Sequence, residues 1–550
     1  MPLTTRPFEF PDSEVMEALM SRLRSLSSPH AILAFLASIS FIYLAPTEAQ
    51  AFCGFYVSGA DQEMYNNATM VVMMREGTKT VLSMRNNYEG PPEDFAMVIP
   101  VPQVLKEENV KVLKDEVFNK VDALAAPRLV EYWEQDPCYG PVYDDESIAM
   151  PTSVEERSMR PRFKRDRDTG VKIEAQFDVG EYNVVILSAK ESNGLETWLK
   201  QEKYNIPKGA APVLKPYIEG GQYFFVAKVN PQKVTFEKGM ARLSPLRFHY
   251  DSEEFSLPVR LGLLNAKGHQ DLIVHILARE TRYEVANYKN VAIPTNLFVD
   301  TTVRDDFAAF YVSLFDWVLQ NNPGAVITEY AWASNSCDPC PTPPLQDPEL
   351  MTLGGDVVVG KPGSTNVELE QSLGSYNWVL TRLHARYTID DLKDDLVFRA
   401  APPIIGGRGT PYGPEAKLNE EGAQLSSYNN FQGRYIMLNR WEGEVECENP
   451  QYGIWGGPPN GGAGVTAAQD TAFAKRGAVD LEKALAQESI PTVNLLPEGP
   501  YKVDLPKPPR AKMCACRSVH TPSVPTDALG WIALGALALG VRRKKKTLSN

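Results

Sequence analysis

Short apolar segments separated by turn residues open the body of the chain. Valine and methionine recur in three of them, at residues 69–74, 80–84 and 95–102. Glu76-Gly77 between the first two is a turn signal, and prolines end the third segment. The sequence therefore predicts a β-hairpin, a third strand and a β-rich, sandwich-like first domain over residues 52–150.

The apolar pattern restarts at Val171, after a charged, proline-containing linker. Strand-like runs and helical runs are mixed over residues 171–300, and short connections between them favour antiparallel pairing. We predict an α+β domain here. Its expected strands are 172–177, 182–188, 222–229, 255–264, 271–278 and 291–298, and a capped helix is expected to start at Asn193.

A further α+β domain with loops rich in Cys, Pro and Gly is predicted over residues 301–490. Its expected elements are a helix over 305–319, a strand over 355–362, a strand or helix over 376–387, a hairpin arm over 428–441 and an amphipathic helix over 466–487. One helix is also expected in the first domain, over residues 114–132. The sequence thus predicts a multidomain, β-rich α+β fold, followed by a proline-rich stalk over 491–513.

The beginning of the chain, residues 1–51, has the pattern of a secretory signal peptide. Its parts are a basic region (Arg22, Arg24), an apolar run (31–45) and a small-x-small cleavage site (Ala49-Gln50-Ala51). We expect the mature chain to begin at Phe52. An uncleaved signal anchor is the alternative, and the sequence leaves open whether translation starts at Met1 or Met20.

A second targeting segment is predicted over residues 514–550. Its parts are Cys514 and Cys516, an apolar run over 528–541 and a basic cluster beginning with Arg542 and Arg543. The arrangement resembles the MYXO-CTERM sorting signal, which implies cleavage by a processing protease in the membrane and display on the cell surface. Before cleavage the apolar run would hold the chain in the membrane, and a plain C-terminal anchor is the alternative. Both place residues 52–513 outside the cytoplasm.

Composition and charge exclude several classes of protein. Of 550 residues, 43% are hydrophobic and 23% charged, which excludes a largely disordered chain, a coiled coil or a polytopic membrane protein. The net charge of −13 excludes nucleic acid as a partner for the bulk of the chain. Without the two ends, residues 52–513 hold 47 basic and 63 acidic groups, a net charge of −16, which favours cations over polyanions.

Export would permit disulfides among the cysteines of this body, which are Cys53, Cys138, Cys337, Cys340 and Cys447. We favour a Cys53–Cys138 bridge, which leaves Cys447 for the other two, but spacing alone does not fix the connectivity. Cys337 and Cys340 have the spacing of a redox pair. The prolines that follow cannot open the helix that would lower a thiol pKa, and no second pair completes a zinc site. We therefore predict a structural, loop-stapling role for this motif.

Four segments resemble a known family. They are Ala51–Val57 (AFCGFYV), Asn86–Gly90 (NNYEG), Asp94–Pro102 (DFAMVIPVP) and Tyr132–Glu134 (YWE). Together they resemble the bacterial domain of unknown function family 2330, over residues 52–350. That family carries no established activity, so the resemblance implies no catalytic residues.

No catalytic, cofactor or metal site is predicted. Residues 355–362 (GDVVVGKP) come within one residue of a phosphate-binding loop, but proline replaces the required Ser or Thr. The histidines lie in no metal-ligand motif, no nucleophile elbow is present, and His275 is predicted to lie in the core. Strand alternation separates Met73 from Met70 and Met74, which favours packing over a copper(I) site.

Acidic and aromatic residues supply two weaker candidates. Residues 144–146 and the aspartates near Asp390 could bind calcium, but neither has the spacing of a calcium loop, and a helix start is expected at Asp390-Asp391. The aromatic residues between Tyr428 and Trp455 would form a glycan-stacking platform if exposed, and would otherwise pack in the core.

These features predict an exported cell-envelope protein, displayed on the outer surface, with a non-enzymatic binding or structural role and an unknown ligand. The alternative is an extracytoplasmic hydrolase whose site is assembled from distant residues. A cavity where histidine, serine and acidic side chains converge would favour the hydrolase.

Overall fold

The structure is a computed structural model. It describes residues 55–58, 69–89, 95–138, 171–189, 192–207, 209–237, 240–265, 268–360, 363–388, 390–459, 464–468, 471, 476–477, 479–486 and 493–497. The backbone divides into two units, Met1–Asp504 and Leu505–Asn550. Every described residue belongs to the first unit.

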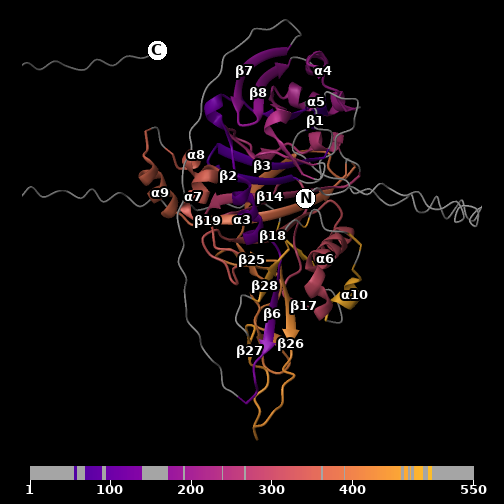
Figure 1. The fold of residues 1–550 in the computed structure, drawn as a ribbon, viewed down its shortest axis with the longest axis vertical. Helices are drawn as coiled ribbons and strands as arrows, with labels where there is room; N and C mark the ends of the chain where they lie inside the picture. Colours follow the sequence, from indigo (N-terminus) through magenta and orange to yellow (C-terminus); the bar gives the residue numbers. More distant parts are fainter. Residues whose placement is uncertain are drawn as a thin grey trace, which may run out of the picture. The chain divides into compact units, whose positions relative to one another are not determined.

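Two β-sheets face each other and enclose the largest hydrophobic core (Figure 1). The first, named here the outer sheet, has the strand order β1-β4-β9-β8-β7, and all its neighbouring strands are antiparallel. Its strands are β1 (Phe55–Ser58), β4 (Phe95–Val101), β7 (Val171–Val179), β8 (Tyr182–Ala189) and β9 (Tyr223–Val229).

The second, named the central sheet, follows the order β10-β11-β3-β2-β14-β19-β18-β25-β21-β24. These strands are β2 (Thr69–Glu76), β3 (Lys79–Glu89), β10 (Thr235–Glu237), β11 (Met240–Arg242), β14 (Gln270–Arg279), β18 (Val326–Ala333), β19 (Trp378–Tyr387), β21 (Ile404–Gly406), β24 (Gln424–Leu425) and β25 (Asn430–Gln432). Shorter strands pair along its sides: β5 (Val110–Val112), β12 (Leu246–Asp251), β16 (Asn290–Ala292) and β29 (Asn494–Leu495).

A third sheet, named the end sheet, lies across the central sheet from the outer sheet (Figure 1). It consists of β17 (Leu297–Val299), β26 (Arg434–Asn439), β6 (Arg128–Glu134) and β27 (Trp455–Gly456), with β28 (Val465–Ala467) also paired to β6. Two small sheets remain. One has the order β13 (Ser256–Leu257), β20 (Leu396–Ala401) and β15 (Arg282–Val285), and the other pairs β22 (Pro411–Tyr412) with β23 (Lys417–Leu418).

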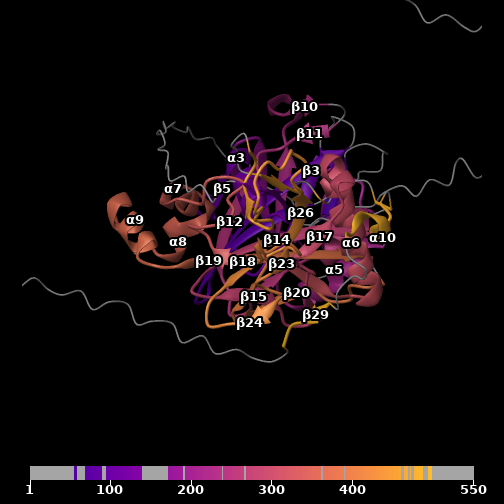
Figure 2. The same ribbon diagram turned by 90° about the horizontal axis from the view of Figure 1, so that it is seen from below.

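Most helices pack on faces of the sheets that do not enclose this core. The described α-helices are α3 (Asp115–Ala125), α4 (Ser192–Gln201), α5 (Ala210–Glu219), α6 (Phe307–Asn321), α7 (Asp347–Leu350), α8 (Asp356–Val358), α9 (Asn366–Gly374) and α10 (Leu481–Ala484). Figure 2 shows α6 and α10 on one side of the sheets and α7, α8 and α9 on the other. Helices α4 and α5 pack on the outer sheet, α3 and α7 pack on the central sheet, and α6 packs where the central and end sheets meet. The predicted β-rich α+β class is confirmed.

The predicted hairpin at the start of the body is confirmed. Strands β2 and β3 pair antiparallel across Gly77, whose positive φ of 59° suits glycine. Alternation along β2 sends Met73 into the core between the sheets, whereas Met70 and Met74 face α3 and α7. The split predicted for these methionines is therefore correct, and their side chains serve as packing.

Proline ends two predicted elements early. The helix expected over 114–132 stops at Ala125, since Pro127 disfavours helical geometry just before it, and β6 follows at once. The strand expected over 255–264 is limited to β13, and a 3-10 helix occupies Arg260–Asn265. These two predictions were wrong in their boundaries.

Close packing and strand pairing overturn three others. In the strand expected over 355–362, residues 356–358 form a helical turn instead. The turn follows the Cβ-free Gly354, which packs so closely on Val81 that an added Cβ would lie 2.8 Å from its side chain. The amphipathic helix expected over 466–487 is replaced, in its described residues, by β28 and α10. The arm expected over 428–441 divides into β25 and β26, which pair in different sheets.

Sheet pairing runs across the segments expected as separate domains. Strand β4 pairs with β9, β3 pairs with β12, and β19 lies between β14 and β18. Strands that are distant in sequence therefore meet at the centre of the central sheet, where an unusual group of charged residues lies.

Candidate functional site

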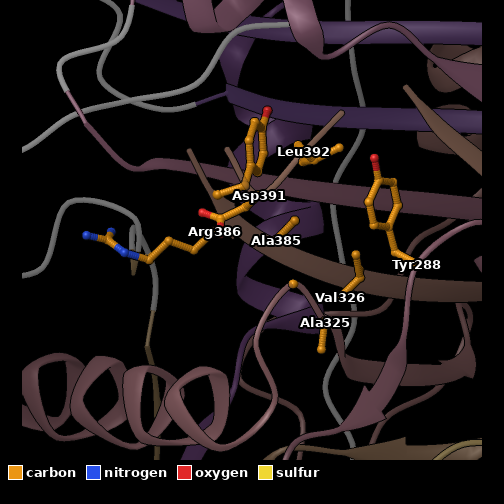
Figure 3. Close-up of a pocket in the computed structure, with 9 residues that line it drawn as sticks. Tyr288, Ala325, Val326, Ala385, Arg386, Asp391 and Leu392 are labelled. Carbon is orange, nitrogen blue, oxygen red and sulfur yellow. The ribbon is translucent and has the colours of Figure 1, made fainter. Parts of the chain in front are cut away.

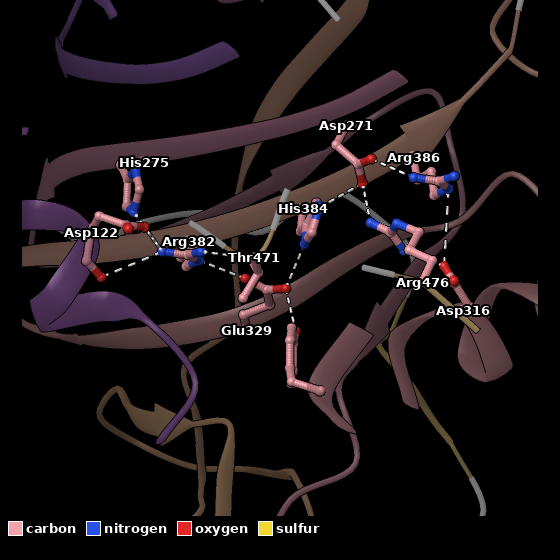
Figure 4. A network of polar contacts seen from close by, with 11 residues as sticks. Asp122, Asp271, His275, Asp316, Glu329, Arg382, His384, Arg386, Thr471 and Arg476 are labelled. Atoms are coloured by element: carbon pink, nitrogen blue, oxygen red, sulfur yellow. Dashed lines mark hydrogen bonds and ion pairs between the residues drawn. The ribbon is translucent and has the colours of Figure 1, made fainter. Parts of the chain in front are cut away.

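Three neighbouring strands of the central sheet place charged side chains on one buried face. Alternation in β14 and β19 directs Leu272 and Leu383 toward the outer sheet. The intervening residues point the opposite way, toward α3 and α6: Asp271 and His275 from β14, and Arg382, His384 and Arg386 from β19. Arg386 is partly exposed, and the other four are at most 2% exposed. Figure 4 shows the resulting network.

Glu329 enters this network through an irregularity in β18. Thr328 pairs with Leu383 and Tyr330 pairs with Arg382, so Glu329 is an extra residue that has no partner in the register. A bulge of this kind redirects a side chain. The Glu329 carboxylate accepts hydrogen bonds from Arg382 Nε at 2.5 Å, from His384 Nδ1 at 2.7 Å and from the Tyr311 hydroxyl of α6.

Asp271 is the second carboxylate at the centre of the network. It lies 3.1 Å from His384 Nε2, and it accepts hydrogen bonds from Arg386 at 2.5 Å and from Arg476 at 2.7 Å. Arg476 also contacts Asp316 of α6. His384 therefore bridges two carboxylates, and its ring stacks on Phe315 at a centroid distance of 4.0 Å.

Arg382 connects the same network to α3. Its Nη1 donates to the Asp122 carboxylate and lies 3.4 Å from His275 Nε2, and its Nη2 lies 3.5 Å from Thr471 Oγ1. The charges balance across the whole set. Negative charges belong to Asp122, Asp271, Asp316 and Glu329, and positive charges belong to Arg382, Arg386, Arg476 and protonated His384.

The surroundings shift the pKa values in opposite directions. Burial would raise the pKa of Glu329, but the charges of His384 and Arg382 outweigh it and lower that pKa to about 2. Burial would lower the pKa of His384, but Glu329 and Asp271 raise it. Burial, followed by the charge of Arg382, lowers the pKa of His275 to about 3. His384 is thus held protonated and His275 neutral.

This arrangement stabilises the fold and keeps both histidines of the network out of reach of a substrate. Both ring nitrogens of His384 contact carboxylates, and the rings of His275 and His384 are fully buried. A general base must reach the proton that it removes. The network is therefore an internal, charge-balanced tie between β14, β18, β19, α3 and α6.

His275 should make the protein less stable in acid. Its folded pKa of about 3 lies below the ordinary value of 6.5, so the unfolded chain binds the proton first and stability falls as pH drops from 6.5 toward 3. The charged groups that act on it are Arg382, Asp122, Glu329 and Arg85. Replacement His275→Gln removes this titration. Between pH 6.5 and 5, we expect wild type to lose about 2 kcal/mol more unfolding free energy than the variant.

Urea denaturation of both proteins at the two pH values measures this difference. His384 has the opposite effect on the free energy of unfolding. Its pKa is raised in the folded protein, so the stabilisation that it provides is present below pH 6.5 and is lost as pH rises through its folded pKa. Equal losses for wild type and His275→Gln between pH 6.5 and 5 would contradict the assignment of a neutral His275.

A small pocket lies beside the network (Figure 3). It is lined by Tyr288, Gly324, Ala325, Val326, Ala385, Arg386, Tyr387, Asp391 and Leu392. Figure 3 shows the Arg386 side chain extending away from the other lining residues, and it pairs with Asp271. The Asp391 carboxylate accepts hydrogen bonds from Thr388, at 2.8 Å from its amide and 2.7 Å from its hydroxyl. No histidine, serine or cysteine lines this pocket.

The cysteines form two disulfides in the described residues. Cys138 pairs with Cys447, and Cys337 pairs with Cys340. The Cys53–Cys138 pairing that the sequence favoured is therefore wrong, because β6 and β26 lie side by side and bring Cys138 to the loop that holds Cys447. Cys53 lies outside the described residues. On the chain-entropy account, a bridge between residues 309 apart stabilises by about 6 kcal/mol at most, whereas a loop of four residues gives about 2 kcal/mol.

The aromatic candidates divide between core and surface. Phe431 and Tyr435 are fully buried, whereas Tyr428 and Tyr452 are about half exposed, at 51% and 47%. Trp441 and Trp455 are partly buried, and Trp455 donates to the Gly413 carbonyl at 3.1 Å. The predicted platform over 428–455 is thus not continuous.

The acidic pair Asp390-Asp391 does not start the helix that the sequence predicts. Asp390-Asp391 forms a turn rather than a helix start, because Asp391 bonds back to Thr388. No group of three or more His, Cys, Asp or Glu side chains that could hold a metal occurs among the residues that the structure describes. The acidic group 144–146, the cleavage site Ala49–Ala51, and Cys514, Cys516, Arg542 and Arg543 lie outside the described residues. No described helix is long and apolar enough to span a membrane.

The sequence analysis did not identify the buried network. A signal was present, because the apolar strand β19 (WVLTRLHARY) carries Arg382, His384 and Arg386 at alternate positions. Charged residues in an apolar strand are rarely buried unless paired. Their partners lie from 53 to 260 residues away along the chain, so spacing could not reveal them.

Comparison with known protein families gives a match to the chain. A family model described as an uncharacterized protein conserved in bacteria (DUF2330) matches residues 47–399. No curated protein and no solved structure matches significantly. The matched range includes β14, β18 and β19 and therefore most of the buried network.

Proposed function

The chain belongs to the DUF2330 family of uncharacterized bacterial proteins, and we propose that it is an exported cell-envelope protein, displayed on the outer surface, with a non-enzymatic binding or structural role. The observation that carries this proposal is the Cys138–Cys447 disulfide. Disulfides form and persist in oxidising compartments outside the cytoplasm. The signal-like sequence before Phe52 and the sorting-like sequence over residues 514–550 agree with export.

The geometry supports a non-enzymatic role over a hydrolase. A hydrolase of the nucleophile–histidine type needs a histidine that can reach substrate. His275 and His384 are inaccessible, and His249 is half-buried with its Nε2 3.0 Å from Asn109. His269 is exposed but does not line the described pocket. Serine and histidine do not line the described pocket. Binding and purely structural roles are separated by screening the mature protein for ligands, since a structural component would retain none.

Surface display should depend on the two cysteines of the C-terminal signal. We expect the double replacement Cys514→Ala and Cys516→Ala to abolish cell-surface display while leaving export intact, because the processing protease would no longer find its cleavage site. Protease shaving of intact cells, followed by immunoblotting of cell fractions, measures both properties. We expect the double variant to remain in the envelope fraction and to be protected from external protease.

A suitable control is Cys337→Ala with Cys340→Ala, which removes a cysteine pair of the body and should leave display unchanged. Unchanged display of the Cys514→Ala, Cys516→Ala variant would refute the sorting assignment. Wild-type protein found only in the cytoplasm, with reduced cysteines, would refute export itself.

A further inference from the structure

The disulfide between Cys337 and Cys340 lies in a surface loop between β18 and α7. The sequence favoured a purely structural role for it, since no helix follows to lower a thiol pKa. The described loop confirms that no helix begins there. Two buried arginines supply positive charge beneath the loop instead, and hydrogen bonds from buried side chains hold the loop without the disulfide.

Buried side chains anchor the loop independently of the disulfide. Arg128 Nη1 donates to the Pro339 carbonyl at 2.7 Å, and Gln432 Nε2 donates to the Asp338 carbonyl at 2.7 Å. Both donors are fully buried. The two carbonyl groups between the cysteines are thus fixed by the strands beneath, and the loop closed by the disulfide is only four residues long. Reduction should therefore leave the loop in place.

The two sulfur atoms differ in access. Cys340 is exposed, whereas Cys337 is partly buried and packs against the cluster between the central sheet and α3. In the other disulfide, both Cys138 and Cys447 are partly buried. Thiol–disulfide exchange begins when a thiolate reaches a sulfur atom, so Cys340 is the accessible point of attack.

Two guanidinium groups lie beneath this loop without a carboxylate partner in the described parts of the chain. Arg128 and Arg434 are register neighbours on β6 and β26, and they are 0% and 2% exposed. The Nε of each has no hydrogen-bond partner among the described residues. Arg128 lies over the Tyr330 ring, and Arg434 donates to the Tyr132 hydroxyl. The exposed Asp338 is the carboxylate whose charge acts on both.

We propose that Cys337–Cys340 is an exchange-competent disulfide that accepts electrons from a dithiol reductant. A thiolate of the reductant attacks Cys340 Sγ, the bond between the two protein sulfurs breaks, and Cys337 leaves as a thiolate. The positive charge of Arg128, which is bonded to the Pro339 carbonyl inside the disulfide loop, and of its register neighbour Arg434 favours that anion. The second thiol of the reductant then displaces Cys340. Two electrons and two protons pass to the protein, and the reductant becomes a cyclic disulfide.

Stepwise reduction of the full, oxidised protein tests the proposal. Aliquots are equilibrated with rising concentrations of dithiothreitol, trapped with iodoacetamide and mapped by mass spectrometry. We expect Cys337 and Cys340 to be alkylated at a dithiothreitol concentration at least tenfold below that needed for Cys138 and Cys447, with the near-UV circular dichroism unchanged at that point. Simultaneous reduction of both disulfides, or loss of tertiary structure with the first, would overturn it.

Two pairs of variants test the direction of attack and the charge effect. The Cys340 thiol freed in Cys337→Ser should react with an aromatic disulfide reagent at least tenfold faster than the Cys337 thiol freed in Cys340→Ser, each followed by mass spectrometry of its own peptide. Equal rates would contradict attack at Cys340. In the reduced protein, Arg434→Gln should raise the pH midpoint of Cys337 alkylation by about one unit, whereas Arg434→Lys should not. Equal midpoints in these two variants would refute the role of the buried charge. The wild-type reduction series decides the main proposal even if these variants fold poorly.

Discussion

Replacing Arg382 with methionine should lower the free energy of unfolding by about 3–5 kcal/mol, the range for removing one partner of a buried ion pair. The Arg382 guanidinium is fully buried and pairs with Asp122 and Glu329. Methionine has a similar length but leaves these carboxylates without that positive charge. Because Arg382 connects β19 to both α3 and β18, the loss should affect the centre of the central sheet.

Denaturant titration of wild type and Arg382→Met at pH 7 measures this effect as a shift of the midpoint. The matched control is Lys483→Ala, which removes an exposed ion pair with Asp480 and should leave the midpoint unchanged, since exposed pairs contribute little. A midpoint shift for Arg382→Met as small as that of the control would show that the network is not energetically important.

The cost should arise from the charge left behind rather than from the lost pair itself. A buried ion pair replaced as a whole by apolar residues is often neutral for stability, while a broken pair is costly. The network joins elements that the hydrophobic core also joins. Its charge balance therefore restricts which strands can meet here, because any other register of β18 against β19 would separate Glu329 from His384.

The sequence was sufficient to predict the local elements that tertiary contacts do not alter. The β2–β3 hairpin, β8, β9, α4 and α6 all occur where apolar runs, turn residues and caps place them. Helix α6, for example, is capped by Asp306, which accepts a hydrogen bond from the Ala309 amide. These signals act within a few residues and can be read from the chain.

Apart from the two elements that prolines end early, the features that failed depend on distant residues. The helical turn at 356–358 follows Gly354, which packs against Val81, more than 270 residues earlier. The position of Glu329 in the network depends on a bulge that is visible only in the pairing with β19. Composition and spacing carry no information about such contacts, so the network and the disulfide connectivity could not be derived.

Opening the Cys138–Cys447 disulfide should also destabilise the protein strongly. The bond joins residues 309 positions apart, and the entropy that a cross-link removes from the unfolded chain grows with loop length. We expect the double replacement Cys138→Ala and Cys447→Ala to lower the free energy of unfolding by about 3–5 kcal/mol. Locally, it would release the loop after β26 from the end of β6, where the Gln451 amide bonds to the Pro137 carbonyl.

Thermal and denaturant unfolding under non-reducing conditions measure this loss. The matched comparison is the double replacement Cys337→Ala and Cys340→Ala, for which the short loop predicts about 2 kcal/mol or less. Limited proteolysis adds a local test, since cleavage between Trp441 and Trp455 should appear only when the long-range bond is missing. If the two double variants were equally stable, then unfolded-state entropy would not explain the contribution of Cys138–Cys447, and local packing around β6 and β27 would have to be its source.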